Sequence, residues 1–212
     1  MATNDNYLKD ISEIRSMMER SSRFISLSGL SGIFAGVFAL LGAGAAYFFL
    51  GMNYYRHYYD GALSSSENYS SFVNSLLLIA LCVLVASLST GVFFTTRKAK
   101  KQGQKIWDKT ARQLIINTAI PLIAGGIFCL ALLYHKAIGL VAPATLVFYG
   151  LALINGSKYT LDDIKYLGIC EIILGLISIF FIGYALFFWA MGCGVLHIVY
   201  GTAMYFKYDL KQ

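Results

Sequence analysis

Two ionisable side chains fall inside apolar stretches of the sequence: Glu171 early in one stretch and His197 in the middle of the next. Ionisable groups inside a membrane-spanning segment are energetically costly and usually face the protein interior or water. With a rise of about 1.5 Å per residue, Glu171 lies roughly 7–8 Å and His197 roughly 13 Å from the same predicted bilayer boundary. A tight turn joins the two stretches, so we expect antiparallel neighbours in which these side chains, if they face each other, touch directly or through one water.

A Glu and a His at this depth could bind a ligand or relay protons, and Asn117 in another apolar stretch is a third candidate for the same site. The simpler interpretation is structural. In that case Glu171 is protonated or hydrogen-bonded near the membrane interface, and His197 is hydrogen-bonded to a carbonyl group within the bundle. The sequence leaves both interpretations open.

Metal binding is the remaining chemistry to consider, because Cys193 and His197 are four residues apart and Cys170 adjoins Glu171. Zinc accepts these ligand types. However, Cys170 and Glu171 point about 100° apart on a helix, and the sequence contains no paired-ligand motif. We therefore predict no metal site and no cofactor.

Sequence motifs of common enzymes are absent. The chain has no glycine-rich phosphate loop followed by Lys and Ser or Thr, no G-x-S-x-G motif and no H-E-x-x-H motif. We therefore predict a protein that is not an enzyme.

The amino-acid composition is typical of a chain embedded in a lipid bilayer. Apolar residues make up 58% of the chain and charged residues 13%, and the mean hydropathy is +0.64. A soluble domain has about 45–50% apolar and about 25% charged residues. Only helices and closed barrels satisfy their backbone hydrogen bonds in lipid, and the apolar runs here are continuous rather than alternating. We therefore predict an all-α integral membrane protein.

Six apolar stretches are long enough to cross a bilayer, whose hydrocarbon core requires about 20 apolar residues. We expect membrane-spanning helices at about residues 27–50, 72–96, 114–133, 137–155, 166–184 and 185–206. Residues 207–212 then form a short tail, and residues 1–26 precede the first span.

The segment before the first span has its own pattern. Between residues 7 and 26, apolar side chains recur at three- and four-residue spacing with charged side chains on the opposite face, which predicts an amphipathic helix. Such a helix can lie on the inner leaflet, cover the ends of the bundle or bind a partner protein. The sequence does not decide among these.

The distribution of positive charge predicts the orientation of the chain. All of the 17 Lys and Arg residues except Arg56 and Lys136 lie in alternate segments between the predicted spans. Positive residues beside membrane-spanning helices stay on the cytoplasmic side. The pattern therefore predicts six crossings of the cell membrane, with both termini in the cytoplasm.

The loop between the second and third spans carries the densest positive charge. Clustered Lys and Arg beside a membrane attract acidic lipid headgroups, and the same charge fixes topology. We predict contact with anionic lipids and no nucleic-acid binding. The residues predicted to contact lipid are Arg97, Lys98, Lys100, Lys101 and Lys105.

Glycines recur at related positions in the first and fifth spans. Gly29 and Gly36 match Gly168 and Gly175 at an offset of 139, which suggests duplicated helical hairpins. Small residues four apart let membrane helices approach closely. The residues predicted to pack in this way are Ser28, Gly32, Gly36, Gly168 and Gly175. The sequence leaves open whether they pack within one chain or between two copies in a homo-oligomer.

Residues 166–205 resemble the HdeD-like family of small multi-pass membrane proteins. The resemblance is carried by glycine spacing in Leu- and Ile-rich helices, in the stretches YLGICEIILGLISIFFIG at 166–183 and WAMGCGVLHIVYG at 189–201. It implies helices built from repeated hairpins and a link to acid stress in bacteria, with no catalytic residues to carry over. The family often has a proline in the turn where this chain has Gly183 and Tyr184.

These features predict a non-enzymatic, multi-pass membrane protein that acts as a membrane-stress, scaffold or regulatory component. The alternative is a small proton- or solute-coupled transporter or channel that uses Glu171 and His197. The small number of polar side chains in the spans favours the first function, and the intramembrane Glu and His favour the second.

Overall fold

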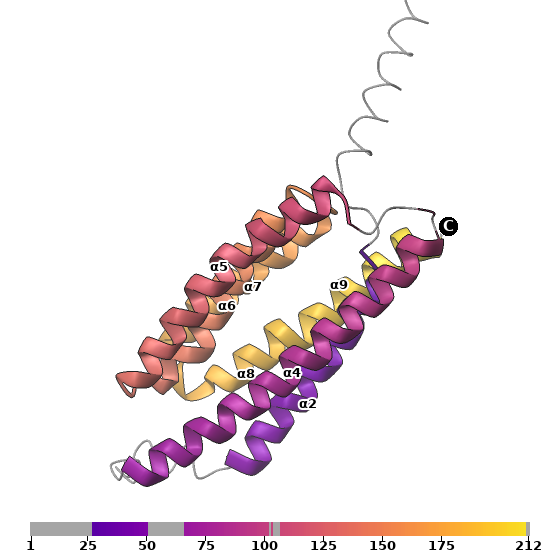
Figure 1. Ribbon diagram of the computed structural model, residues 1–212. Coiled ribbons are helices and arrows are strands. Elements are labelled where there is room, and N and C mark those ends of the chain that lie inside the picture. The colour runs from indigo at the N-terminus through magenta and orange to yellow at the C-terminus, as the bar shows by residue number, and fades with distance from the viewer. Residues whose placement is uncertain (1–26, 51–65, 102, 104–106, 211–212) are drawn as a thin grey trace, which may run out of the picture.

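The computed structural model describes residues 27–50, 66–101, 103 and 107–210, and every regular element in this part of the chain is a helix (Figure 1). The all-α prediction is therefore confirmed for these residues. The long helices are α2 (Gly29–Leu50), α4 (Ser66–Lys101), α5 (Lys109–Tyr134), α6 (Val141–Ser157) and α7 (Asp163–Phe180). The amphipathic helix predicted over residues 7–26 lies outside the described residues, as does Lys105.

The last helical stretch is assembled from consecutive segments of different pitch. A 3₁₀ turn at Ile182–Tyr184 leads into α8 (Ala185–Trp189), which is followed by a π-helical segment (Ala190–Leu196) and α9 (His197–Met204). A second π-helical segment, Tyr205–Asp209, ends the stretch. π-helical turns are rare and are frequently found at functional sites. The first one here ends immediately before His197.

Five helical segments among the described residues are long and apolar enough to cross a membrane. They are Gly29–Phe49, Tyr69–Lys101, Lys109–Tyr134, Ile138–Ser157 and Ile182–Asp209. Helix α7, within the fifth predicted span, is not one of them, because its 18 residues include Asp163, Lys165 and Glu171. By length and composition, the five helices are those of a multi-pass membrane protein.

The helices form two layers (Figure 1). In the first layer α2 lies between α4 and α9, and in the second α6 lies between α5 and α7. Helix α8 leads from the second layer into the first. The layers meet where α6 and α7 face the last helical stretch.

Glycine brings the central helix of each layer into backbone contact with a neighbour. A Cβ atom on Gly36 of α2 would lie 2.6 Å from the carbonyl oxygen of Gly194. Similarly, a Cβ atom on Gly150 of α6 would lie 2.5 Å from the carbonyl oxygen of Gly168. Neither position can hold a side chain in this packing. Close backbone approach increases dispersion contacts between membrane helices, where lipid provides no hydrophobic drive.

The pairing of helices differs between the two ends of the chain. Helix α2 packs against the following helix, α4, as a hairpin. Helix α7 instead packs mainly against the preceding helix, α6, and contacts the following stretch much less. The duplicated hairpins therefore stay a prediction.

Apolar side chains join the two layers at one end, which we call the basic end because Lys98 and Lys207 lie there. Leu161, Ile164 and Met204 form a buried cluster. The side chains packed against this cluster are Leu27, Leu153 and Tyr208. The cluster fixes how α7 and α9 lie relative to each other, and so helps to position Glu171 opposite His197.

Helix α4 presents the most apolar surface to its surroundings. None of the residues in its most apolar 18-residue window is buried inside the protein. The exposed leucines of this helix are Leu77, Leu78, Leu81, Leu84 and Leu88. Such a surface is suited to contact with the hydrocarbon of a lipid bilayer.

Candidate functional site

Glu171 and His197 lie next to each other at the boundary between the two layers. Oε1 of Glu171, from the middle of α7, is 3.4 Å from Nδ1 of His197, the first residue of α9. Glu171 is 0% exposed and His197 is 6% exposed. The structure therefore brings the two residues together by direct contact, as their spacing in the sequence allows.

Tyr149 of α6 completes this cluster, and the sequence analysis did not identify it. Its hydroxyl oxygen lies 2.7 Å from Nε2 of His197, and the two rings face each other at a centroid distance of 5.3 Å. Tyrosines of membrane helices usually lie at the interface, and a buried hydroxyl requires a partner. The central position of Tyr149 in its apolar helix was the signal that could have revealed it.

A backbone carbonyl determines which nitrogen of His197 carries the proton. Nδ1 lies 3.1 Å from the carbonyl oxygen of Gly192, which can only accept a hydrogen bond. Nδ1 must therefore be protonated. In a neutral imidazole Nε2 is then the acceptor, and Tyr149 donates its hydroxyl proton to it.

Gly192 also makes room for the carboxyl group of Glu171. A Cβ atom at this position would lie 2.4 Å from Oε2 of Glu171 and 2.7 Å from Cδ2 of Leu146. Gly192 belongs to the π-helical segment Ala190–Leu196. This segment therefore contributes both the carbonyl that orients His197 and the space that Glu171 occupies.

Glu171 is unusual in its hydrogen bonding. Neither Oε1 nor Oε2 has a hydrogen-bond partner among the described residues, although both atoms are buried. Most buried polar atoms are hydrogen-bonded, because an unpaired one retains its full desolvation cost. A buried carboxyl group without hydrogen-bond partners makes this cluster the candidate functional site. We call Glu171, His197 and Tyr149 the intramembrane cluster.

The remaining ligand candidates do not gather around the intramembrane cluster as a metal site. Sγ of Cys170 lies 3.9 Å from the hydroxyl oxygen of Tyr200, on the neighbouring helix α9. Within residues 27–50, 66–101, 103 and 107–210, no group of three or more His, Cys, Asp or Glu side chains is placed to hold a metal ion.

Asn117 is not part of the intramembrane cluster. Its side-chain amide donates a hydrogen bond of 2.8 Å to the carbonyl oxygen of Gln113 in its own helix, α5. Helix α5 packs on the far side of α6. The structure therefore separates Asn117 from the two residues with which the sequence analysis grouped it.

The residues predicted to pack helices together lie against helices of the same chain. A Cβ atom on Gly32 would be 3.1 Å from Cα of Gly201, and one on Gly175 would be 3.0 Å from the carbonyl oxygen of Pro143. Gly36 and Gly168 make the backbone contacts described above. The fifth, Ser28, donates a hydrogen bond of 3.0 Å to Asp209. These small-residue faces are therefore occupied within one subunit.

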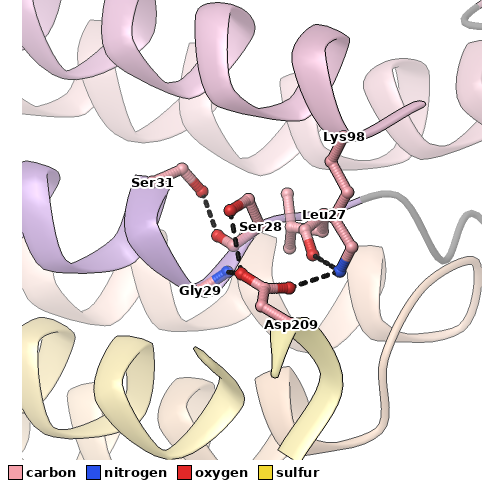
Figure 2. A network of polar contacts seen from close by, with 6 residues as sticks. All are labelled: Leu27, Ser28, Gly29, Ser31, Lys98 and Asp209. Carbon is pink, nitrogen blue, oxygen red and sulfur yellow. Dashed lines mark hydrogen bonds and ion pairs between the residues drawn. The ribbon is translucent and has the colours of Figure 1, made fainter. Parts of the chain in front are cut away.

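A second polar network lies at the basic end, within the first layer, and Figure 2 shows it. Oδ2 of Asp209 accepts hydrogen bonds of 3.0 Å from the hydroxyl of Ser28 and from the backbone N–H of Gly29. Oδ1 accepts a bond of 2.6 Å from Nζ of Lys98, which also donates to the carbonyl oxygen of Leu27 at 3.1 Å. We call these residues the Asp209 network. It ties the end of the last helical stretch to the start of α2 and the end of α4.

The Asp209 network changes the interpretation of the predicted lipid-contact residues. Lys98 is paired inside the protein, and its side chain is only 11% exposed. Arg97, Lys100 and Lys101 are exposed at the same end of α4. Only these three of the described lipid candidates are free of the network and turned to the surroundings.

A third polar contact joins the two layers at the basic end. Lys207 and Tyr208 donate hydrogen bonds of 2.9 Å and 2.7 Å to Oδ2 of Asp163, at the start of α7. Burial raises the pKa of Asp163, but the hydrogen bonds from Lys207 and Tyr208 and the charge of Lys207 outweigh burial, so the pKa lies below its ordinary value. The Asp163 carboxylate is therefore a stable ionic contact at neutral pH.

No protein-family model, curated protein or solved structure matches this chain. The resemblance of residues 166–205 to the HdeD-like family therefore stays a prediction, and the function has to be argued from the geometry of the site.

Proposed function

We propose that this chain is a small, non-enzymatic membrane protein that moves protons across the membrane, as a proton-coupled transporter or a channel that uses Glu171 and His197. The proposal is carried by one observation: Glu171 and His197 lie 3.4 Å apart at mid-helix, on the boundary between two helical layers. Ionisable residues at such a depth are expensive, and in membrane proteins they commonly mark proton relays and ion pathways.

The proposal includes six spans in the cell membrane, with both termini in the cytoplasm. Helix α7 has 18 residues, which correspond to about 27 Å at a rise of ~1.5 Å per residue, close to the ~30 Å thickness of the hydrocarbon core. Its charged residues Asp163 and Lys165 lie in its first turn, where they can reach the interface. The alternation of positive charge along the sequence supports the orientation.

The position of the intramembrane cluster links its protonation state to the packing of the two layers. The titratable groups that face Glu171 are His197 of α9, Tyr149 of α6 and Cys193 of the π-helical segment. Gain or loss of a proton changes the net charge between the two layers. Since charge in a low-dielectric interior acts strongly, each protonation state favours a different packing of one layer on the other, which is how transporters alternate their access.

Proton flux into liposomes tests the proposal. The parent protein, Glu171→Gln and His197→Ala are reconstituted with a pH-sensitive dye inside the vesicles, and a pH gradient is applied. We expect flux in the parent and a decrease of at least about tenfold in both variants. Asn117→Ala is the matched control, because Asn117 is also polar and lies in a span but is bonded within its own helix. Absence of flux in the parent at every pH would refute the transport function.

A second candidate function is that of a membrane-stress, scaffold or regulatory component that transports nothing. The observation that favours it is the closed basic end, where Leu161, Ile164 and Met204 fill the space between the layers and Lys207 bonds to Asp163. This candidate predicts no flux, but a pH-dependent change in Trp189 fluorescence that Glu171→Gln removes. In that case residues 7–26 become the segment to test for a protein partner.

Anionic lipid is the partner that the charge distribution supports. Arg97, Lys100 and Lys101 are exposed at the basic end, and each basic residue near an acidic membrane surface contributes about 1 kcal/mol of attraction. Flux or stability measured in vesicles with and without acidic phospholipid tests this part of the proposal. Indifference to acidic phospholipid, at constant ionic strength, would contradict it.

A further inference from the structure

We infer that Tyr149 is the third residue of the proton relay and that protons cross the His197 ring from Nε2 to Nδ1, entering from Tyr149 and leaving to Glu171. The claim that protons travel from Tyr149 to Glu171 rests on the proposed function. The order of the three residues rests on their hydrogen bonds, which can be measured independently of transport.

Nδ1 of His197 is protonated in the resting state. The Gly192 carbonyl oxygen lies 3.1 Å from Nδ1 and has no proton to donate. A bare Nδ1 would place two acceptors against each other, so Nδ1 holds a proton. A nitrogen that already holds a proton cannot receive another.

The proton on Nδ1 determines where the ring can accept a second proton. An incoming proton can bind only at Nε2, and Nε2 faces the hydroxyl of Tyr149 at 2.7 Å. On the other side of the ring, Oε1 of Glu171 is 3.4 Å from Nδ1 and has no hydrogen-bond partner. Tyr149 is therefore at the entry of the ring and Glu171 at its exit.

Exposure supports the same order. Tyr149 is half-buried, whereas His197 is 6% exposed and Glu171 is 0% exposed. Tyr149 is therefore the most accessible of the three side chains.

Each proton transfer in the relay breaks one bond to hydrogen and forms another. A proton from water binds the Tyr149 oxygen while the proton of its O–H bond moves to Nε2, so that Tyr149 stays neutral and His197 becomes an imidazolium ion. The Nδ1–H bond then breaks, and its proton forms a new O–H bond with the carboxylate oxygen Oε1 of Glu171. One proton has been taken from water, Glu171 has become a carboxylic acid, and neutral His197 carries its proton on Nε2. No electron is gained or lost, and the ring returns to its first state when Nε2 gives up its proton and Nδ1 gains one.

Tyr149→Phe isolates the role of the hydroxyl, because phenylalanine keeps the ring that packs against His197. Tyr200→Phe is the matched control: Tyr200 also reaches from one layer to the other, but to Cys170 and not to His197. Both changes are made in a chain whose only histidine is His197, through His57→Gln and His135→Gln. Proton flux and the ¹⁵N NMR spectrum of the His197 ring are measured on each protein.

In the parent we expect an Nδ1–H resonance and a hydrogen-bonded Nε2 acceptor. In Tyr149→Phe we expect the Nε2 resonance to move to that of a free acceptor, Nδ1 to stay protonated, and flux to fall by about tenfold or more. Tyr200→Phe should match the parent in both measurements.

Two results would overturn the inference. A parent spectrum with the proton on Nε2 would reverse the proposed order, and parental flux in Tyr149→Phe would exclude Tyr149 from the relay. If the parent shows no flux, the transport function fails and the relay fails with it. The spectra then still decide whether Tyr149 orients His197, so the two failures can be told apart.

Discussion

The Asp209 network and the intramembrane cluster are built from the same chemistry, but their carboxyl groups accept different numbers of hydrogen bonds. In each, a carboxyl group faces a basic side chain on another helix. Asp209 accepts three hydrogen bonds, from Ser28, Gly29 and Lys98. Glu171 accepts none, although His197 lies 3.4 Å away.

The difference distinguishes a contact whose carboxyl group is already hydrogen-bonded from one whose carboxyl group can still form hydrogen bonds. The Asp209 network joins helices within one layer, and both oxygens of its carboxyl group accept hydrogen bonds. The intramembrane cluster lies between layers, and Glu171 retains unused hydrogen-bonding capacity there. A group in this condition gains interactions when it binds a proton or moves closer to its neighbour.

The largest effect should come from breaking the close helix approach on which the Asp209 network depends. A Cβ atom on Gly29 would lie 2.3 Å from the backbone nitrogen of Tyr205. Gly29→Val should therefore push the last helical stretch away from α2 and displace Asp209, at a cost of about 3 kcal/mol in the free energy of unfolding. Denaturant titration in detergent measures this. Gly44→Val in the same helix is the control, since nothing lies within 4 Å of its Cβ position, and an equal loss there would contradict the explanation.

The next effect should come from removing the Asp209 carboxylate itself. Asp209→Ala leaves Lys98 without an ionic partner and leaves the first N–H group of α2 uncapped. We expect a loss of about 2 kcal/mol in the free energy of unfolding. Lys101→Ala, an exposed residue at the same end of α4, should cost much less, and similar losses in the two variants would argue against the network as a structural contact.

The corresponding change in the intramembrane cluster should behave differently. Glu171→Gln removes a buried ionisable group that has no hydrogen bond to lose, so we expect the free energy of unfolding to stay within about 1 kcal/mol of the parent value. The same titration in detergent tests this directly. A loss as large as that of Asp209→Ala would show that Glu171 is structural, and the comparison between the two sites would no longer hold.

The smallest effect should come from Asp163, at the exposed end of the boundary between layers. Its pKa is lowered on folding, so its stabilising contribution is complete above the unfolded pKa of about 3.9 and is lost as the pH falls through the lower, folded value. Asp163→Asn should cost about 0.5 kcal/mol near neutral pH. The cost should shrink below about pH 4, where the parent loses the same contact. A cost that stays constant down to low pH would mean that the charge of Asp163 is not involved.

The sequence predicted the helices well because lipid imposes a simple rule on it. A run of about 20 apolar residues has few structures available to it other than a helix. Which helices pack against each other was less predictable from the sequence. Glycine spacing showed that α2 and α7 each have a face of small residues, but Gly168 packs on Gly150 of α6 rather than on the helix that follows α7. A small face permits close approach to any helix and does not specify one.

The sequence by itself determined that the chain is helical and apolar, that Glu171 and His197 lie inside its apolar stretches, and that the turn between them makes contact feasible. These follow from residue type and from the constant rise of a helix. Only the tertiary structure decided that Tyr149 and the Gly192 carbonyl hold the two nitrogens of His197, that Asn117 is bonded within α5, and that Lys98 faces Asp209 rather than lipid. The physical reason is that hydrogen bonds depend on the rotation and separation of neighbouring helices, and these are set by side-chain packing across the whole bundle.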